Sequence, residues 1–356
     1  MNMPDRYEKS PKKFTNGGMA TALLFRDKHL DREVIIKVLH SNTEQKRLID
    51  EVKALGAVRS KHVVEIYDVI KNNSGKIRAV VVEYVPGDDL SSKLGKCNTD
   101  EVLRIAFAIA SGLSDIHRVG QIHRDIKPEN MKFDAEGCLK IFDFGLSRTE
   151  ELDAKTSGAV GTLGYLAPEL CVADGEDVTF SQAVDIYAFA STILALINGS
   201  IPKPMRAIPP KLPCILGDFS KQKVALPETV STILNKCFAE DPTERPSIDQ
   251  ILDIISLNLL EGQHRASLVV GGKVYNLHAG NKSVKVNSGN LGSFDLTYNG
   301  FTFTLTPTGG YVFINNIITA LPIQIPGSCV VTLGPPSAGL NRAYVPVDVS
   351  HPEVLI

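Results

Sequence analysis

The stretch His123-Arg124-Asp125-Ile126-Lys127-Pro128-Glu129-Asn130 places acidic, basic and amide side chains close together in the chain. Asp143-Phe144-Gly145 follows soon after it, behind the largely apolar residues 139–142. Phosphoryl transfer needs oxygen ligands for Mg²⁺, a carboxylate that orients the attacking hydroxyl group, and a cation near the transferred phosphoryl group. Asp125, Lys127, Asn130 and Asp143 supply these groups in one ordered set. The sequence therefore predicts a site for phosphoryl transfer.

With these motifs, residues 14–258 resemble the eukaryotic-like Ser/Thr protein kinases, notably those of bacteria. The resemblance implies that Asp125 is the catalytic base, that Lys127 contacts the γ-phosphate, and that Asn130 and Asp143 bind Mg²⁺. It also implies a bilobal α+β fold that uses ATP and Mg²⁺ to phosphorylate Ser/Thr residues of protein substrates and of its own activation loop. We therefore expect a serine/threonine-protein kinase.

Earlier segments resemble the nucleotide-binding parts of the same family. Lys37 ends the strand-like run Val34-Ile35-Ile36-Lys37 and matches the lysine that contacts the α- and β-phosphates. Glu51, on a helix expected over residues 43–58, matches the glutamate that pairs with this lysine. By the same resemblance, the backbone groups of Glu83 and Val85 form the hinge that binds adenine.

The Gly-rich loop departs from the family pattern. Thr15, Gly17, Ala20 and Ala22 occupy its key places, so that Gly17 and the neighbouring Gly18 are the glycines that remain. The backbone must approach the phosphates closely in this loop, and glycine allows that approach. We therefore expect weakened nucleotide binding rather than a loss of catalysis.

This departure keeps a second hypothesis open, a nucleotide-binding pseudokinase that acts as a signalling scaffold. The retention of Lys37, Asp125, Asn130 and Asp143 argues against it. A third hypothesis, a small-molecule kinase of the aminoglycoside type, fits poorly because such relatives usually lack motifs like Ala167-Pro168-Glu169.

The activation segment runs from Asp143 to Glu169, and Arg124 resembles the arginine that binds a phosphate placed there. Thr162, after Gly161, is typical of Ser/Thr kinases and is expected to contact Asp125 and Lys127. The candidate sites of autophosphorylation are hydroxyl residues of this segment: Thr156 first, with Ser157 and Thr149.

Three further residues are expected to be structural. The His123 ring should anchor the catalytic loop, and Asp185 should steady that loop from a helix. Arg245 matches the partner of Glu169 in the family.

The density of charged residues divides the chain near residue 266. Residues 267–356 hold 7 of the 78 charged residues and are rich in short β-prone runs separated by turn signals such as Asn299-Gly300. We therefore expect these parts: a solvated tail over 1–13, a kinase N-lobe over 14–85, a C-lobe over 86–258 that opens on a helix capped by Thr99, a linker over 259–266, and an all-β sandwich over 267–356.

The β-rich part resembles a degenerate forkhead-associated (FHA) domain. The resemblance rests on Gly310–Asn316, Pro322–Gly327 and Val331–Gly334, and it implies a sandwich of the kind that binds phosphothreonine. The phosphate-binding motifs of that family are not recognisable; Lys285-Val286-Asn287 and Thr297-Tyr298-Asn299-Gly300 stand in their places. Its partner is expected to be a phosphoprotein or the kinase domain itself, or its role is purely structural.

Composition excludes several other classes of protein. A net charge of −2, from 38 basic and 40 acidic residues, argues against nucleic-acid binding, which needs a basic face. No apolar run reaches the length of a membrane span, and the first residues lack the apolar core of a signal peptide. The six cysteines are scattered, which argues against a zinc site or a disulfide framework. We expect a cytoplasmic protein without a membrane or nucleic-acid partner.

Overall fold

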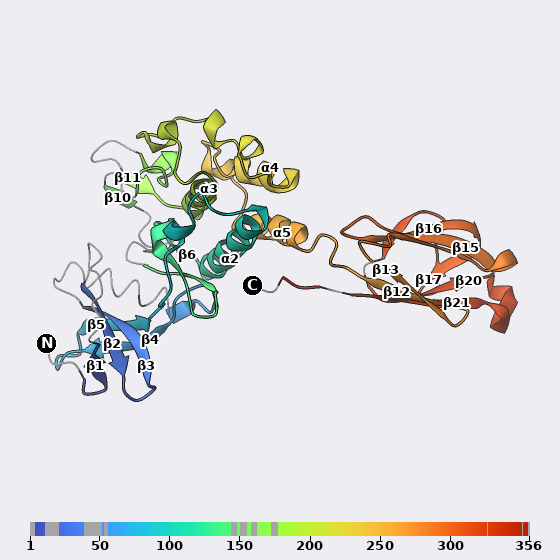
Figure 1. Cartoon of the computed structure of the whole chain (residues 1–356), viewed down its shortest axis with the longest axis horizontal. Coiled ribbons are helices and arrows are strands. Elements are labelled where there is room, and N and C mark those ends of the chain that lie inside the picture. The colour runs from blue at the N-terminus through green and yellow to red at the C-terminus, as the bar shows by residue number, and fades with distance from the viewer. Residues whose placement is uncertain are drawn as a thin grey trace. The chain divides into compact units, whose positions relative to one another are not determined.

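The computed structural model describes residues 4–10, 21–38, 52, 56–143, 148–149, 155–157, 162–171, 177–325, 327–350 and 352–354. These residues form two compact units, one that ends at Ile255 and one over Ser256–Leu355. Figure 1 shows the strands and helices of both units.

An antiparallel sheet of five strands opens the first unit, in the order β1-β2-β3-β5-β4. Its strands are β1 (Tyr7–Lys9), β2 (Thr21–Asp27), β3 (Arg32–Val38), β4 (Ile66–Lys71) and β5 (Ile77–Glu83). Alternating apolar residues of these strands form one core, in which Val34 and Ile36 are fully buried. This core holds β3, the strand of Lys37, in register between β2 and β5.

The expected N-terminal tail is partly wrong, because β1 pairs with the edge of this sheet. The Tyr7 ring is 5% exposed, and its hydroxyl group donates to Asp68 Oδ2 at 2.8 Å. Arg6 donates to both carboxylate oxygens of the fully buried Asp27. The sequence predicts a solvated tail for this charged segment, because its burial depends on partners far along the chain.

The rest of the first unit contains the helices α2 (Thr99–Arg118), α3 (Ala183–Asn198) and α4 (Glu228–Lys236), and α5 (Ile248–Leu259) begins near its end. Three short antiparallel pairs accompany them, β6 (Gln121–Ile122) with β9 (Arg148–Thr149), β7 (Met131–Phe133) with β8 (Leu139–Ile141), and β10 (Lys155–Ser157) with β11 (Asp177–Thr179). Most residues of α3 are buried, so this helix forms the centre of the helical part. None of the described helices is long and apolar enough to cross a membrane.

The cap of α2 differs from the prediction by one residue. Asn98, not Thr99, is the N-cap, and its side chain accepts the backbone N–H of Glu101 at 2.9 Å. Glu101 in return accepts the backbone N–H of Asn98 at 3.0 Å. This reciprocal capping box satisfies two N–H groups at once, which a threonine at the next position would not do.

The second unit consists of β-strands in two antiparallel sheets. The strands are β12 (Ala266–Val270), β13 (Lys273–Leu277), β14 (Ser283–Asn287), β15 (Gly292–Tyr298), β16 (Phe303–Gly310), β17 (Val312–Ile314), β18 (Ile317–Ile318), β19 (Ile323–Ile325), β20 (Cys329–Leu333) and β21 (Ala343–Val349). One sheet has the order β13-β12-β21-β20-β17-β18 and the other β14-β15-β16-β19.

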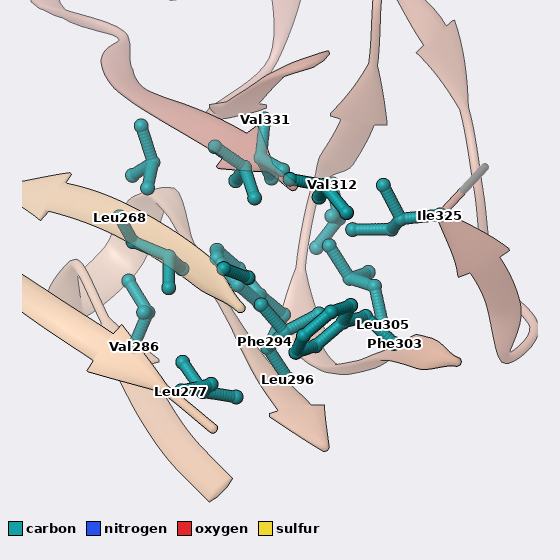
Figure 2. Close-up of a cluster of buried hydrophobic side chains, with 14 of the residues drawn as sticks. Leu268, Leu277, Val286, Phe294, Leu296, Phe303, Leu305, Val312, Ile325 and Val331 are labelled. Atoms are coloured by element: carbon teal, nitrogen blue, oxygen red, sulfur yellow. The ribbon is translucent and has the colours of Figure 1, made fainter. Parts of the chain in front are cut away.

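A single core is built from both sheets of this unit. Leu268, Val312 and Val331 come from the first sheet, and Phe294 and Leu305 come from the second. Figure 2 shows these side chains gathered between the strands. The expected hairpin at Asn299-Gly300 joins β15 to β16, where the Asn299 side chain accepts the N–H groups of two following residues. Two sheets with one shared core are the arrangement of a β-sandwich.

Candidate active site

Asp125 lies at the centre of a hydrogen-bonded network in the loop after β6. Lys127 Nζ lies 2.9 Å from Asp125 Oδ1 and 2.7 Å from Oδ2. Asn130 Nδ2 donates to Asp125 Oδ2 at 2.7 Å and to its backbone oxygen at 2.8 Å. Thr162 Oγ1 donates to Asp125 Oδ1 at 3.2 Å and accepts from Lys127 Nζ at 2.9 Å, so both predicted contacts of Thr162 are present. The network holds the carboxylate in one orientation beside a positive charge.

A buried carboxylate holds the backbone of this loop. Asp185, in the first turn of α3, accepts the backbone N–H groups of His123 and Arg124, each at 2.8 Å. His117 Nε2 donates to the same carboxylate at 2.9 Å. Burial by itself raises the pKa of Asp185, but the hydrogen bonds from His117 and His123 outweigh it and the pKa lies below its usual value. The ionised Asp185 therefore fixes the loop that carries Asp125.

The His123 ring links the catalytic loop to the segment before Asp143. Its Nε2 donates to the carbonyl oxygen of Phe142 at 3.1 Å, and its Nδ1 accepts the backbone N–H of Asp125 at 3.3 Å. The side chain is fully buried, and this burial lowers its pKa. As predicted, the neutral ring has a structural position.

Two residues of the site have left-handed backbone conformations that are uncommon outside glycine. The φ angles of Arg124 and Asp143 are 70° and 69°. Such residues are common at active sites, and they persist only where the surrounding structure holds them in place. Here the Asp185 carboxylate holds Arg124, and the Arg124 guanidinium group lies 3.7 Å from the centre of the buried Phe180 ring.

The groups predicted to bind phosphate and metal lie close together. Lys37 Nζ lies 3.6 Å from Asp143 Oδ1, and the Asp143 side chain is 53% exposed. The backbone N–H of Phe142 donates to the backbone oxygen of Asn130 at 3.0 Å, which keeps Asn130 beside the segment of Asp143. Because Asn130 Nδ2 donates to Asp125, the other end of the amide presents an oxygen atom.

Amide and carboxylate oxygens are the ligands that Mg²⁺ prefers, so Asn130 and Asp143 fit this ion. The part of the chain that the structure describes contains no group of three or more His, Cys, Asp or Glu side chains arranged to hold a metal ion. A nucleotide-bound Mg²⁺ commonly takes one or two protein ligands and completes its shell with phosphate and water.

The predicted hinge begins where β5 ends. Glu83 is the last residue of β5. Val85, two residues further along the chain, is 6% exposed. The Glu83 carboxylate pairs with Lys140 of β8, whose Nζ lies 3.0 Å from Oε1. Lys140 was not singled out from the sequence, because the alternation of a strand places a lysine between two buried residues on the opposite face, where it is expected to be exposed.

Glu169 and Arg245 form the expected pair. Arg245 Nη1 and Nη2 each donate to one carboxylate oxygen of Glu169 at 2.7 Å. The Arg245 side chain is fully buried and also donates to the backbone oxygens of Ala183 and Ala239. This bidentate pair ties the end of the activation segment to the helical part.

Several predicted residues cannot be placed in this site. Gly17, Gly18 and Glu51 lie outside the described residues, as do Thr15 and Ala20. The backbone of Thr149 belongs to β9, and the backbones of Thr156 and Ser157 belong to β10. Their roles remain predictions. Phe180 was missed because a single aromatic residue before a helix carries no sequence signal for a cation contact.

Known proteins resemble the first unit of the chain. A family model for the protein kinase domain matches residues 9–254. The chain is 37% identical over 200 residues to the serine/threonine-protein kinase drp72 of Corynebacterium efficiens, across 52% of this chain and 38% of that protein. It is 31% identical over 243 residues to the serine/threonine-protein kinase PrkC of Bacillus subtilis, across 64% of this chain and 37% of that protein.

A plant protein gives a similar match. The chain is 30% identical over 264 residues to the CBL-interacting protein kinase 9 of Oryza sativa, across 70% of this chain and 56% of that protein. The matched parts thus span only about one third to one half of these relatives' lengths. The family model, however, covers more than half of this chain and includes Lys37, Asp125, Asn130 and Asp143. The chain therefore belongs to the protein kinase domain family.

Proposed function

We propose that this protein transfers the γ-phosphoryl group of ATP to Ser/Thr residues of proteins, including Ser/Thr residues of its own activation segment. The observation that carries the proposal is the network in which Lys127, Asn130 and Thr162 orient the Asp125 carboxylate. Support also comes from the names of the relatives, which are serine/threonine-protein kinases. The reaction consumes ATP, so we keep the cytoplasm as its proposed location.

The chain's own residues can perform three tasks in this reaction. Asp125 accepts a hydrogen bond from the attacking hydroxyl group and orients it. Lys127, beside Asp125, stabilises the negative charge of the transferred group. Lys37, near Asp143, holds the other phosphates. A bound Mg²⁺ would neutralise phosphate charge, and Asn130 and Asp143 are the residues that would hold it.

Incubation with radiolabelled ATP and Mg²⁺ tests this proposal. We expect the wild-type chain to label itself or an added protein, and we expect Asp143→Asn to lose the label. Asp253→Asn is the matched control, because Asp253 is an exposed residue of α5. A wild-type chain that binds ATP without transferring phosphate would instead be the pseudokinase of the second hypothesis.

For the second unit we propose an FHA-like fold over residues 267–356, joined to the kinase domain by residues 259–266. The support is the two-sheet sandwich with its shared core. The residues in the places of the phosphate-binding motifs have local partners: Lys285 pairs with Asp295 at 3.7 Å, and Asn287 accepts the N–H of Gly289. The partner we propose for this unit is a phosphoprotein or the kinase domain itself.

A titration with a phosphothreonine peptide tests the phosphoprotein half of this proposal. We expect saturable binding that Lys285→Ala weakens and that the unphosphorylated peptide lacks. Lys273→Ala, another exposed lysine of the same unit, is the control. Equal binding of both peptides would remove phosphate recognition from this unit.

A further inference from the structure

A largely buried ion pair joins β5 directly to β8. Lys140 Nζ lies 3.0 Å from Glu83 Oε1 and 3.2 Å from Glu83 Oε2. The two side chains are 11% and 16% exposed. Glu83 ends β5 where the hinge begins, and Lys140 is the middle residue of β8, which leads to Asp143. The pair therefore connects the strands that lead to the two ends of the nucleotide site.

A third segment, residues 62–65, braces this connection. The backbone N–H of Glu65 donates to Glu83 Oε2 at 3.1 Å, and Glu83 returns a backbone N–H to the oxygen of Glu65 at 2.8 Å. On the other side, Ile141 of β8 donates to the oxygen of His62 at 2.8 Å and accepts from Val64 at 3.0 Å. Hydrogen bonds thus attach residues 62–65 to β5 through Glu65 and to β8 through His62 and Val64. The ion pair links the two strands directly.

An ion pair is a poor choice for cohesion alone. Removing two charges from water costs free energy, and apolar side chains of similar volume can stabilise a buried contact equally well. What the pair adds is a preferred distance, because the charge-assisted hydrogen bonds from Lys140 Nζ to Glu83 form only near hydrogen-bond distance and the attraction weakens as the two groups separate. The Glu83–Lys140 pair is suited to fixing one distance between β5 and β8.

We infer that Glu83 and Lys140 are positioning residues that set the distance between the hinge and Asp143. The inference rests on the proposed function, in which the hinge binds adenine and Asp143 binds the metal on the phosphates. Mg·ATP must contact both ends of the site at once. Adenosine contacts the hinge alone. Loss of the ion pair should therefore weaken Mg·ATP binding and leave adenosine binding nearly unchanged.

Calorimetric titration of the full chain with Mg·ATP and with adenosine tests this inference. Lys140→Met removes the charge and keeps an apolar stem. Glu83→Gln removes the charge and keeps the backbone and an acceptor for the N–H of Glu65. We expect each variant to raise the Kd of Mg·ATP about tenfold and the Kd of adenosine less than about twofold. A tenfold change in Kd lies within the range of interaction energies measured between residues in contact. The double variant should bind Mg·ATP no more weakly than either single variant, because both substitutions remove the same interaction.

Arg104→Met is the matched control, because Arg104 also pairs with a carboxylate, that of Asp100, but at an exposed site. It should leave both Kd values unchanged. A thermal unfolding curve for each variant separates loss of folding from loss of positioning.

Equal weakening of adenosine and Mg·ATP, additive effects in the double variant, or a lower Tm with unchanged Kd values would each overturn the inference. The proposed function fails separately, if the wild type binds Mg·ATP and transfers no phosphate; in that case the difference between the two ligands still tests the positioning role.

Discussion

Asp125 is held by donors from three other residues, Lys127, Asn130 and Thr162. Two of these lie in the same loop, and the third comes from the activation segment. A carboxylate that is oriented in this way can accept a hydroxyl hydrogen bond without first rearranging. The role proposed for Asp125 therefore concerns the transfer step and not the binding of nucleotide.

Asp125→Asn should lower kcat by roughly 10²–10⁴-fold, because an amide cannot serve as the base that accepts the hydroxyl proton. The Kd of Mg·ATP should change little, since Asp125 does not hold the nucleotide. Single-turnover kinetics and calorimetry measure the two quantities, with Asp253→Asn as the control. A variant that keeps more than about a tenth of the wild-type rate would show that Asp125 is not the base.

Asp27 is a residue whose ionisation should affect folding. The hydrogen bonds from Arg6, and a backbone N–H from His29, lower the pKa of this fully buried carboxyl to about 2. A lowered pKa contributes stability that is present above the pKa of the unfolded chain, about 4, and is lost as the pH falls toward 2. The bond between residues before β1 and the end of β2 is thus weakest in acid.

Asp27→Asn should therefore lower Tm at pH 7, and the difference from wild type should shrink toward pH 2. Asp31→Asn is the control: Asp31 pairs with Arg26 at an exposed site, and exposed pairs contribute little stability. Thermal unfolding from pH 7 to pH 2 provides the measurement. A difference in Tm that stays constant over this range would mean that Asp27 stabilises the fold in a way unrelated to its charge.

Among the elements, strand β10 of the activation segment pairs with a strand that follows the segment. Strand β10 pairs with β11 so that Thr156 lies opposite Val178 along the backbone. A phosphate on this strand would add about 1.5–2 negative charges to a segment that belongs beside the catalytic loop. Such a charge can bind a guanidinium group through charge-assisted hydrogen bonds, which is the role that the sequence predicts for Arg124.

Mass spectrometry after incubation with ATP should find phosphate on Thr156 first, and Thr156→Ala should lower activity. The Asp143→Asn chain is the control, because it should not autophosphorylate. Phosphate confined to positions outside residues 146–162, or full activity of Thr156→Ala, would exclude control through this segment.

At the scale of the whole molecule, each of the two units has its own core, so each should respond to damage separately. Gly310 and Gly289, both in the second unit, have left-handed backbones with φ angles of 64° and 59°. A Cβ atom on Gly310 would lie 2.6 Å from Gly292 Cα, whereas one on Gly289 would meet nothing within 4 Å. An alanine at Gly289 therefore introduces backbone strain alone, whereas an alanine at Gly310 introduces the same strain and a steric clash.

Gly289→Ala should destabilise the second unit by about 1 kcal/mol through backbone strain. Gly310→Ala should cost roughly 2–5 kcal/mol, because overpacking adds to the strain. Hydrogen exchange measured by mass spectrometry should show faster exchange in β12–β21 for Gly310→Ala and unchanged exchange in β3 and β5. Equal effects of the two variants, or faster exchange in both units, would contradict this account.

Several features were predictable from the sequence because they depend on residues close together in the chain. Asp125, Lys127 and Asn130 lie within one short loop, so their spacing alone brings their side chains together. The hairpin at Asn299-Gly300 and the alternation of buried residues in β15 are equally local. Local backbone geometry and the period of a strand are properties that a short sequence carries by itself.

What only the tertiary structure decided depends on partners far along the chain. Strand β1 exists because Tyr7 packs on the sheet and bonds Asp68, 61 residues later. The N-cap of α2 is Asn98 and not Thr99, because Asn98 exchanges hydrogen bonds with Glu101. Lys140 meets Glu83 across 57 residues, and no spacing rule joins a β8 lysine to a hinge carboxylate. A sequence shows which polar groups need a partner once they are buried. The fold selects that partner, because burial and distance are properties of the packed chain.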